Sequence, residues 1–382
     1  MSNAVSSPLH SSGVCASDNF RHNRPGLSVL GSLPDGTVAS SNSARCHRAR
    51  TGDKSGRHLL SGRLPRIDVG MNGQSFVHAS VMLEEICDVF ASLTHGTFLD
   101  ATVGGGGHSR ALLERHPQLS LLGLDQDETA LDAASRNLSE FSARVTLRRA
   151  RFHRLAEVCA SLDITQLSGA LFDLGVSSPQ FDVAERGFSY RLDGPLDMRM
   201  DRTQELTADT VVNTYDKDQL ARIISSHSDE RFADRIARAI VAARPIRSTL
   251  QLAEVVTTAI PAATRRRGGH PAKRTFQAIR IEVNQELNIL ESSLRDAIAL
   301  LAPGARLAVI TFHSGEDRIV KDVMRHAETG GCTCPPGLPC GCAAVSLVSR
   351  VRAPRTASTQ EIAMNSRAAS ARLRVVEKKA QV

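Results

Sequence analysis

Four short apolar runs, separated by segments of helical periodicity, most restrict the folds open to this chain. The runs are Thr97–Asp100, Leu121–Asp125, Val145–Leu147 and Gly169–Asp173, and three of them end in an aspartate. Strands that alternate with helices form parallel sheets with helices on both faces. The pattern therefore predicts an α/β fold with a doubly wound sheet, whose strand ends meet at one ligand-binding edge.

The chain changes character after residue 181. Residues 182–274 show a turn-rich stretch and helical patterns but no strand signal, which predicts a helical insertion domain for substrate recognition. Residues 71–181 and 275–382 together form the predicted α/β domain. Its second part contains a helix at Phe276–Leu301, a strand at Ala305–Thr311, a helix at Glu316–His326 and a strand-like run at Leu373–Glu377.

Residues 1–70 differ in composition from the rest of the chain. They are rich in Ser, Gly, Arg and His and contain nine Lys or Arg against four Asp or Glu. Such a segment cannot bury enough apolar surface to offset the entropy of ordering, so we predict a disordered basic N-terminal extension. An organelle transit peptide and a natural start at Met71 are the alternatives. We expect a cytoplasmic protein, or one of an organelle matrix if residues 1–70 are a transit peptide.

Composition also limits the partners. No run of 18 uncharged apolar residues occurs, so no membrane span is expected. The formal net charge of +7 favours an anionic partner, and nucleic acid is the commonest such partner. Ordinary variation in a soluble enzyme is the alternative explanation of the charge.

A glycine-rich turn follows the first predicted strand, at Gly104–Gly107. It lacks the Gly-Lys-Ser/Thr of a phosphate-binding loop and the strict G-x-G-x-x-G spacing of dinucleotide sites. Asp125 ends the second strand, where a carboxylate can accept hydrogen bonds from both hydroxyls of a ribose. These features suit either NAD or S-adenosylmethionine, and a tight turn with a solvated Asp is the alternative. Phe152 could lie against an adenine or pack in the core.

The fourth predicted strand ends in Asp-Leu-Gly-Val-Ser-Ser-Pro-Gln, residues 173–180. Amino-group methyltransferases place a short polar-proline motif at this point, because a conjugated amine is a poor nucleophile and must be oriented by acceptors. We therefore expect Asp173, Ser177 and Ser178 to be catalytic, with a plain Ser/Pro turn as the alternative. Asp173 and His313 are candidate general bases, and His313 could instead be a structural residue at a strand end. DNA amino-methyltransferases carry a polar-proline-proline-aromatic motif, which this chain lacks.

Taken in order, these residues resemble the bacterial 16S rRNA (cytosine-N4) methyltransferase family, RsmH or MraW, from about Val77 to Lys378. The resemblance implies a class I S-adenosylmethionine methyltransferase, with a Rossmann-like doubly wound sheet and a helical insertion. It also implies N4-methylation of a decoding-centre cytosine, position 1402 in the usual rRNA numbering. The matching blocks are His78–Glu85, Gly104–Ser109, Asp173–Gln180, Glu185–Tyr190, Asp193–Asp201, Pro271–Arg280 and Thr311–Lys321.

The resemblance also assigns roles to individual residues. Two departures, Gly315 in place of the usual leucine and a C-terminal Asn365–Arg372 block without the usual proline, do not touch the cofactor motifs. The implied cofactor is S-adenosyl-L-methionine. Its implied contacts are Gly106, Gly107, His108, Asp125, Phe152, Asp173 and Gln180.

An rRNA substrate requires a surface for a base and for phosphates. Phe188 and Tyr190 could stack on an extruded cytosine, or they could pack the insertion onto the core. The expected partner is 16S rRNA or the small ribosomal subunit, with no membrane and no DNA. A basic run provides candidate phosphate contacts, although such runs are commonly just solvated. Its members are Arg265, Arg266, Arg267, Lys273 and Arg274.

Four cysteines cluster near the C-terminus as Cys332, Cys334, Cys340 and Cys342. Four thiolates can bind zinc tetrahedrally, although the two C-x-C spacings are tighter than the C-x2-C of zinc ribbons. A flexible thiol-rich loop is the alternative. The other four cysteines are scattered, which argues against a secreted disulfide framework.

Overall fold

The computed structural model describes residues 80–265, 269–335 and 341–380, so the predicted extension at 1–70 lies outside the described residues. Seven strands form one sheet in the order β3-β2-β1-β4-β5-β7-β6, in which only β7 pairs antiparallel to its neighbours. This is the doubly wound class I methyltransferase sheet that was predicted. The strands are β1 Gly96–Asp100, β2 Leu119–Asp125, β3 Val145–Arg149, β4 Leu167–Asp173, β5 Leu301–Thr311, β6 Val348–Arg350 and β7 Arg372–Lys378.

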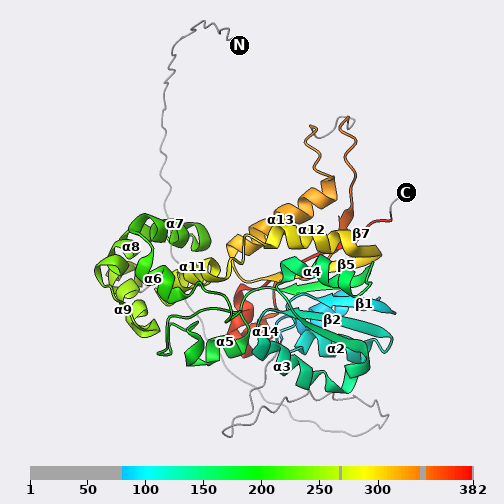
Figure 1. The fold of residues 1–382 in the computed structure, drawn as a ribbon. Helices are drawn as coiled ribbons and strands as arrows, with labels where there is room; N and C mark the ends of the chain where they lie inside the picture. The colour runs from blue at the N-terminus through cyan, green and yellow to red at the C-terminus, as the bar shows by residue number, and fades with distance from the viewer. Residues whose placement is uncertain (1–79, 266–268, 336–340, 381–382) are drawn as a thin grey trace, which may run out of the picture. The chain divides into compact units, whose positions relative to one another are not determined.

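Helices cover both faces of this sheet (Figure 1). The helices before and between the strands are α1 Leu83–Val89, α2 Gly107–Arg115, α3 Glu128–Asn137, α4 Leu155–Ser161 and α5 Ser178–Asp182. The helices of the inserted part are α6 Ala208–Thr214, α7 Lys217–Ser228, α8 Ala233–Ala242, α9 Thr249–Ala259, α10 Ala262–Arg265 and α11 Lys273–Asn284. Those that follow are α12 Leu290–Leu300, α13 Ser314–Thr329 and α14 Thr359–Met364.

The period of two along each strand divides the apolar core into two layers. In β1, Leu99 packs with α4, α12 and α13 on one face, while Phe98 packs with α1, α2 and α3 on the other. Phe172 and Leu171 of β4 divide between the two layers in the same way. Because both faces are buried, the strands read in the sequence as continuous apolar runs rather than as alternating ones.

One predicted helix is wrong in extent. The periodicity at Phe276–Leu301 corresponds to two helices, α11 and α12. The chain leaves α11 at Gln285, which adopts a left-handed conformation with φ of 51°. Glycine or asparagine usually takes that position, so the sequence carried no signal for the break.

The inserted helices enclose an apolar core of their own. α6, α7, α8 and α9 contribute to it, and Phe276, Ile279 and Val283 of α11 belong to it as well. By packing, the helical part therefore extends about ten residues past the predicted boundary at 274. No strand occurs among the described residues of 182–274. The residues from 80 onward belong to one compact unit, so the division into two domains stays a prediction.

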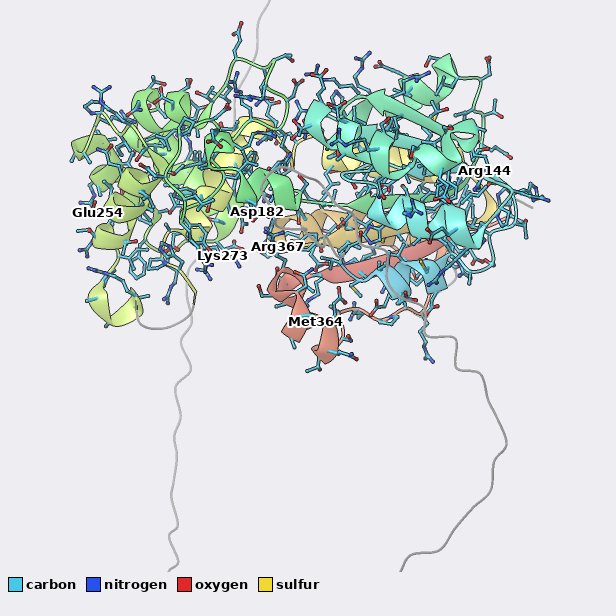
Figure 2. All side chains as sticks on the ribbon, turned by 90° about the horizontal axis from the view of Figure 1, so that it is seen from below. Arg144, Asp182, Glu254, Lys273, Met364 and Arg367 are labelled. Carbon is cyan, nitrogen blue, oxygen red and sulfur yellow. The ribbon has the colours of Figure 1, made fainter. Side chains whose placement is uncertain are left out.

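The C-terminal segment lies beside α5, the helix that follows β4. Arg367 Nη2 lies 3.1 Å from Asp182 Oδ1 of α5, and the two side chains lie side by side although 185 residues separate them (Figure 2). Among the described residues, no helix is both long and apolar enough to cross a membrane.

Asn284 joins the inserted part to its neighbours. Its side chain is fully buried; its amide nitrogen donates to Met198 O at 2.8 Å and to Arg280 O at 2.9 Å, and its oxygen accepts from Met200 N at 2.8 Å. Truncating such a side chain leaves buried backbone groups without partners.

We predict that Asn284→Ala lowers the free energy of unfolding by about 2 to 3 kcal/mol, because two or more buried polar groups lose their hydrogen bonds. Urea unfolding followed by circular dichroism measures the change. Asn288→Ala is the matched control, since Asn288 is exposed, and it should change stability by less than about 0.5 kcal/mol. Equal effects of the two substitutions would show that the hydrogen bonds of Asn284 do not stabilise the contact between the inserted part and its neighbours.

Candidate cofactor-binding and active site

Three aspartates end adjacent strands of the sheet and are tied together by the segment that follows β1. Asp100, Asp125 and Asp173 are the last residues of β1, β2 and β4, and β1 lies between the other two. Gly104 N donates to Asp125 Oδ2 at 2.9 Å, and Asp173 N donates to Thr102 Oγ1 at 2.7 Å. The segment from Ala101 to His108 thus links three strand ends at the predicted ligand-binding edge.

Asp125 is held by backbone donors. Its Oδ1 accepts from Asp127 N at 2.9 Å while its Oδ2 accepts from Gly104 N. Burial raises the pKa of this carboxyl to about 6, and the two backbone hydrogen bonds oppose that rise. At neutral pH the group is therefore an ionised, oriented acceptor. Each oxygen keeps a lone pair for a further donor, such as a ribose hydroxyl.

Asp173 is the least satisfied of the three carboxyls. Its Oδ1 is buried without a hydrogen-bond partner among the described residues, and its Oδ2 lies 3.7 Å from His108 Nδ1. Burial raises its pKa well above 3.8, and the nearby charges of Asp100 and Glu316 raise it further. His108 itself is buried, and its Nε2 bonds Val81 O at 2.9 Å, which fixes the ring beside Asp173. A buried acceptor that lacks a donor suits a site that receives a donor from a ligand.

Asp100 was not singled out in the sequence, and it supports the other two. Its carboxylate accepts from Ser109 Oγ at 2.6 Å and from Thr102 N at 3.3 Å. Burial raises its pKa to about 6. Its position at a strand end next to a Gly-rich turn was the available signal.

The glycines of the turn fall into two pairs. A Cβ placed on Gly105 would meet no atom within 4 Å, and one on Gly104 would meet only Thr102 O at 3.9 Å. Gly106, with φ of 78°, instead packs against Leu138, and a Cβ on Gly107 would lie 2.1 Å from Ser80 Oγ. Gly106 and Gly107 were the expected cofactor contacts, yet Gly104 and Gly105 leave the open backbone surface.

Gln180 joins the loop after β4 to Asp127 through two side-chain hydrogen bonds. Its Oε1 accepts from Ser177 N at 3.0 Å, and its Nε2 donates to Asp127 Oδ2 at 2.8 Å. The same oxygen accepts from Arg186 Nη1 at 2.7 Å, and both members of that ion pair are buried. The polar loop after β4 is therefore fixed to the N-terminus of α3, where Asp127 is the capping residue. Sequence reasoning missed Asp127 and Arg186, because 59 residues separate the pair.

The remaining predicted active-site residues are placed as follows. Ser177 is half-buried beside Gln180, and Ser178 begins α5. Phe152 is half-buried in the turn that follows β3, with its ring edge-to-face with that of Phe172 and the ring centroids 5.8 Å apart.

His313 caps α13: its Nδ1 accepts from Glu316 N at 3.3 Å, and its Nε2 lies 3.0 Å from Glu316 Oε1. The structural role left open for His313 is therefore the one its contacts show.

The predicted RNA contacts divide between core and surface. Phe188 has an exposed fraction of 3% and lies in the core of the inserted helices, which agrees with the packing alternative rather than with stacking on a base. Tyr190 is half-buried and stacks on His270, with ring centroids 4.4 Å apart. Arg265, Lys273 and Arg274 are exposed, and Figure 2 shows Lys273 on the inserted helical part. Arg266 and Arg267 lie outside the described residues.

Comparison with known proteins gives the family. A family model described as the MraW methylase family matches residues 75–379. The chain belongs to the MraW methylase family. The resemblance seen in the sequence is thereby confirmed.

Two relatives of this MraW family member share one name. Ribosomal RNA small subunit methyltransferase H of Symbiobacterium thermophilum is 52% identical over 311 residues, covering 80% of this chain and 97% of the relative. The protein of the same name from Thermobifida fusca is 48% identical over 314 residues, covering 79% of this chain and 93% of the relative. A solved rRNA methylase from Streptococcus thermophilus covers 78% of this chain and 94% of its own, at 12% identity and a TM-score of 0.35.

The raised pKa of Asp173 gives this MraW family member a predictable response to pH. A carboxyl whose folded pKa exceeds its unfolded value contributes stability below the unfolded pKa, and this contribution is lost as pH rises through the folded pKa. We predict that Asp173→Asn raises the melting temperature of the cofactor-free chain by a few degrees near pH 7.5, with the gain vanishing toward about pH 4.

Thermal unfolding across that pH range measures the difference between the two proteins. Asp193→Asn, on an exposed loop, is the matched control and should shift the melting temperature little at any pH. A gain for Asp173→Asn that grows toward low pH would contradict a raised pKa of Asp173 in the folded chain.

Proposed function

We propose that this chain transfers a methyl group from S-adenosylmethionine to the N4 amino group of a cytosine in 16S rRNA, in the decoding centre. Membership of the MraW methylase family and the name of its relatives support rRNA methylation. The observation that carries the finer proposal is Asp173 Oδ1, a buried acceptor without a donor at the end of β4. An exocyclic amine is the donor that such an acceptor would orient.

The described residues fit the cofactor. Gly104 and Gly105 leave open space beside the backbone, and Asp125 presents two oriented oxygens for the ribose diol. Phe152, at the neighbouring strand end, offers a ring edge or face to the adenine. When bound, S-adenosylmethionine supplies an electrophilic methyl group on a positively charged sulfur.

Asp173 has two tasks in this scheme. Its carboxylate accepts an N–H of the cytosine amine, which turns the nitrogen lone pair toward the methyl group. A carboxyl whose pKa burial has raised ionises readily when a positive charge is placed beside it. Once the nitrogen holds the methyl group and the electron pair of the broken sulfur–carbon bond has returned to the sulfur, the amine would carry a positive charge and lose a proton, for which Asp173 Oδ1 is the proposed acceptor. Because His313 Nε2 lies 3.0 Å from Glu316 Oε1 and its Nδ1 caps α13, we assign His313 a structural role rather than that of the base.

The substrate surface is assigned to the inserted helices. Arg265, Lys273 and Arg274 expose their charges there and suit phosphate oxygens. Because N4 of a paired cytosine is blocked, the base must be unpaired or extruded to reach Asp173. We propose the small ribosomal subunit or its 16S rRNA as the partner, rather than DNA, and the cytoplasm as the place of action.

We predict that Asp125→Ala weakens S-adenosylmethionine binding by about 10-fold to 100-fold, because hydrogen bonds to a charged acceptor contribute about 1.5 to 3 kcal/mol. Isothermal titration calorimetry measures the affinity. Asp132→Ala, an exposed carboxylate on α3, is the control and should bind as the unaltered chain does. If Asp125→Ala binds S-adenosylmethionine with unaltered affinity, the cofactor does not bind at this edge of the sheet as proposed.

The reaction itself is tested with labelled S-adenosylmethionine and three substrates: small ribosomal subunits, naked 16S rRNA and duplex DNA. Nucleoside mass spectrometry should find N4-methylcytidine in the rRNA alone. Asp173→Ala should lower the rate by about 100-fold or more, because a positioning and proton-accepting group is lost. Methylation of DNA, of a ring carbon or of a ribose would overturn the proposal.

A further inference from the structure

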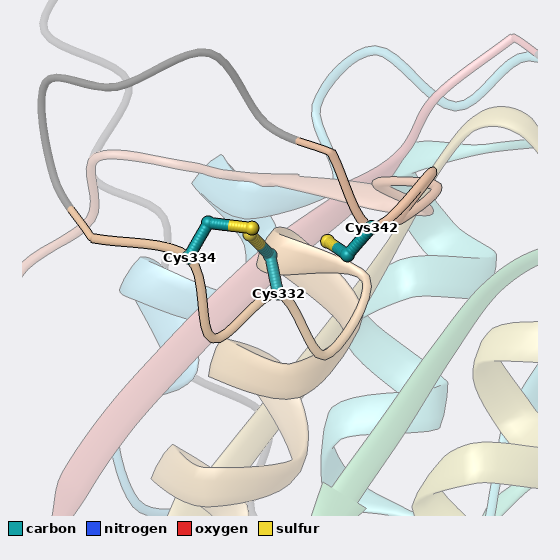
Figure 3. Close-up of side chains that lie close together, drawn as sticks. All are labelled: Cys332, Cys334 and Cys342. Carbon is teal, nitrogen blue, oxygen red and sulfur yellow. The ribbon is translucent and has the colours of Figure 1, made fainter.

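Three cysteine side chains converge in the connection between α13 and β6 (Figure 3). The Sγ atoms of Cys332, Cys334 and Cys342 all lie within 4.8 Å of one another. Cys334 and Cys342 come from the two limbs of a loop, so sequence proximity alone does not bring them together. Cys340, the fourth cysteine of the sequence pattern, lies outside the described residues.

This spacing suits one metal ion. Thiolates bound tetrahedrally at about 2.3 Å from a zinc ion lie about 3.8 Å from one another. Cysteines that bind different irons of a cluster are spread further apart, because each sulfur contacts its own iron. A limit of 4.8 Å on all three separations therefore favours a single ion.

The available donors select a soft metal. Between Glu328 and Glu361 the sequence contains no Asp, Glu or His, so sulfur is the metal-binding side-chain type within the loop itself. The ring of His326, near the end of α13, lies beside Gly331 but is not part of the group of converging ligand atoms. Carboxylate-binding ions such as magnesium and calcium find no ligands there. Thiolates in tetrahedral arrangement are typical of structural zinc.

The base of the loop is fixed by backbone contacts. α13 ends at Gly330, and a Cβ on this residue would lie 2.5 Å from Val345 O on the returning limb. Leu347 N donates to Ala327 O at 2.8 Å, and Arg350 Nε pairs with Glu328 Oε2 at 2.7 Å. The two limbs therefore start and end side by side, which leaves the cysteines to join them further out.

The described residues at the outer end of the loop bury little apolar surface. Cys332 and Cys334 are half-buried, and Pro335, Gly341 and Cys342 are exposed. A segment that buries so little apolar surface gains little from packing, so a defined loop of this kind is stabilised by a cross-link instead.

The position of the cysteines argues for a structural rather than a catalytic ion. α13 begins beside the active-site edge at His313 and runs 16 residues before the loop begins. At 1.5 Å per residue, the helix separates the two by about 24 Å. An ion at that distance cannot act on the cytosine or on the cofactor.

We propose that Cys332, Cys334 and Cys342 bind one zinc ion, which fastens the two limbs of the α13–β6 connection at the edge of the sheet where β6 joins. The three thiolates supply three tetrahedral positions. Binding releases the thiol protons and involves no oxidation. The proposal does not depend on the methylation proposed above.

Metal analysis of the full-length chain, purified under reducing conditions without chelators, tests this. Inductively coupled plasma mass spectrometry should find about one zinc per chain. The variant Cys332→Ser/Cys334→Ser/Cys342→Ser should lose it. Cys87→Ser/Cys159→Ser is the matched control and should keep it, because burial raises the pKa of both those thiols and disfavours the thiolates that bind metal.

A second measurement does not depend on variants that fold. Cobalt added to the metal-stripped chain should give the thiolate-to-cobalt charge-transfer band and the visible bands of a tetrahedral site, and zinc should abolish both. Calorimetric titration with S-adenosylmethionine should give the same affinity before and after stripping. The proposal is overturned by zinc-free protein that shows no cobalt bands, by zinc retained in the triple variant, or by a disulfide among these cysteines under the same reducing conditions.

Discussion

The segment that follows β1 is the constraint on which the rest of the site depends. It hydrogen-bonds to three strand ends at once: Gly104 N donates to Asp125, Ser109 Oγ donates to Asp100, and Thr102 Oγ1 accepts from Asp173 N. Two of these contacts use carboxylate oxygens and the third uses a backbone N–H, all at the carboxyl ends of parallel strands. The open surface at Gly105 and the buried acceptor of Asp173 therefore occupy fixed positions, as a site for an in-line transfer requires.

A second set of buried polar contacts joins this site to the inserted helices. Asp127 lies two residues beyond Asp125, and it binds both Gln180 of the loop after β4 and Arg186, which precedes the inserted helices. Arg186 in turn donates to Arg199 O. The element proposed to hold RNA and the element proposed to hold the cofactor thus share one carboxylate, and removing it would leave a buried guanidinium without its partner.

Much of this arrangement could be predicted from the sequence, and the exceptions have physical reasons. Strand ends were predictable because the sheet buries both faces and three of the four apolar runs stop at an aspartate. The break at Gln285 was not, because a glutamine carries no signal for a left-handed conformation. The sequence could not decide between packing and stacking for Phe188, and it could not show the pairing of Asp127 with Arg186, because both depend on how distant segments pack. Within the glycine run, composition alone could not separate open positions from packed ones.

Two carboxyls near the proposed active site show how the fold assigns their roles. Burial raises the pKa of Glu316, but hydrogen bonds from His313 and Phe312 N and the charge of Arg280 outweigh it and lower that pKa below its usual value. Asp173 is only partly buried and lacks such donors, and its pKa is raised well above its usual value. Environments that shift the pKa values of two acids in opposite directions leave one acid as a permanent structural anion and the other as the group that can exchange a proton. Asp173 therefore destabilises the folded chain at neutral pH, and this destabilisation is a consequence of keeping an acceptor available to a ligand.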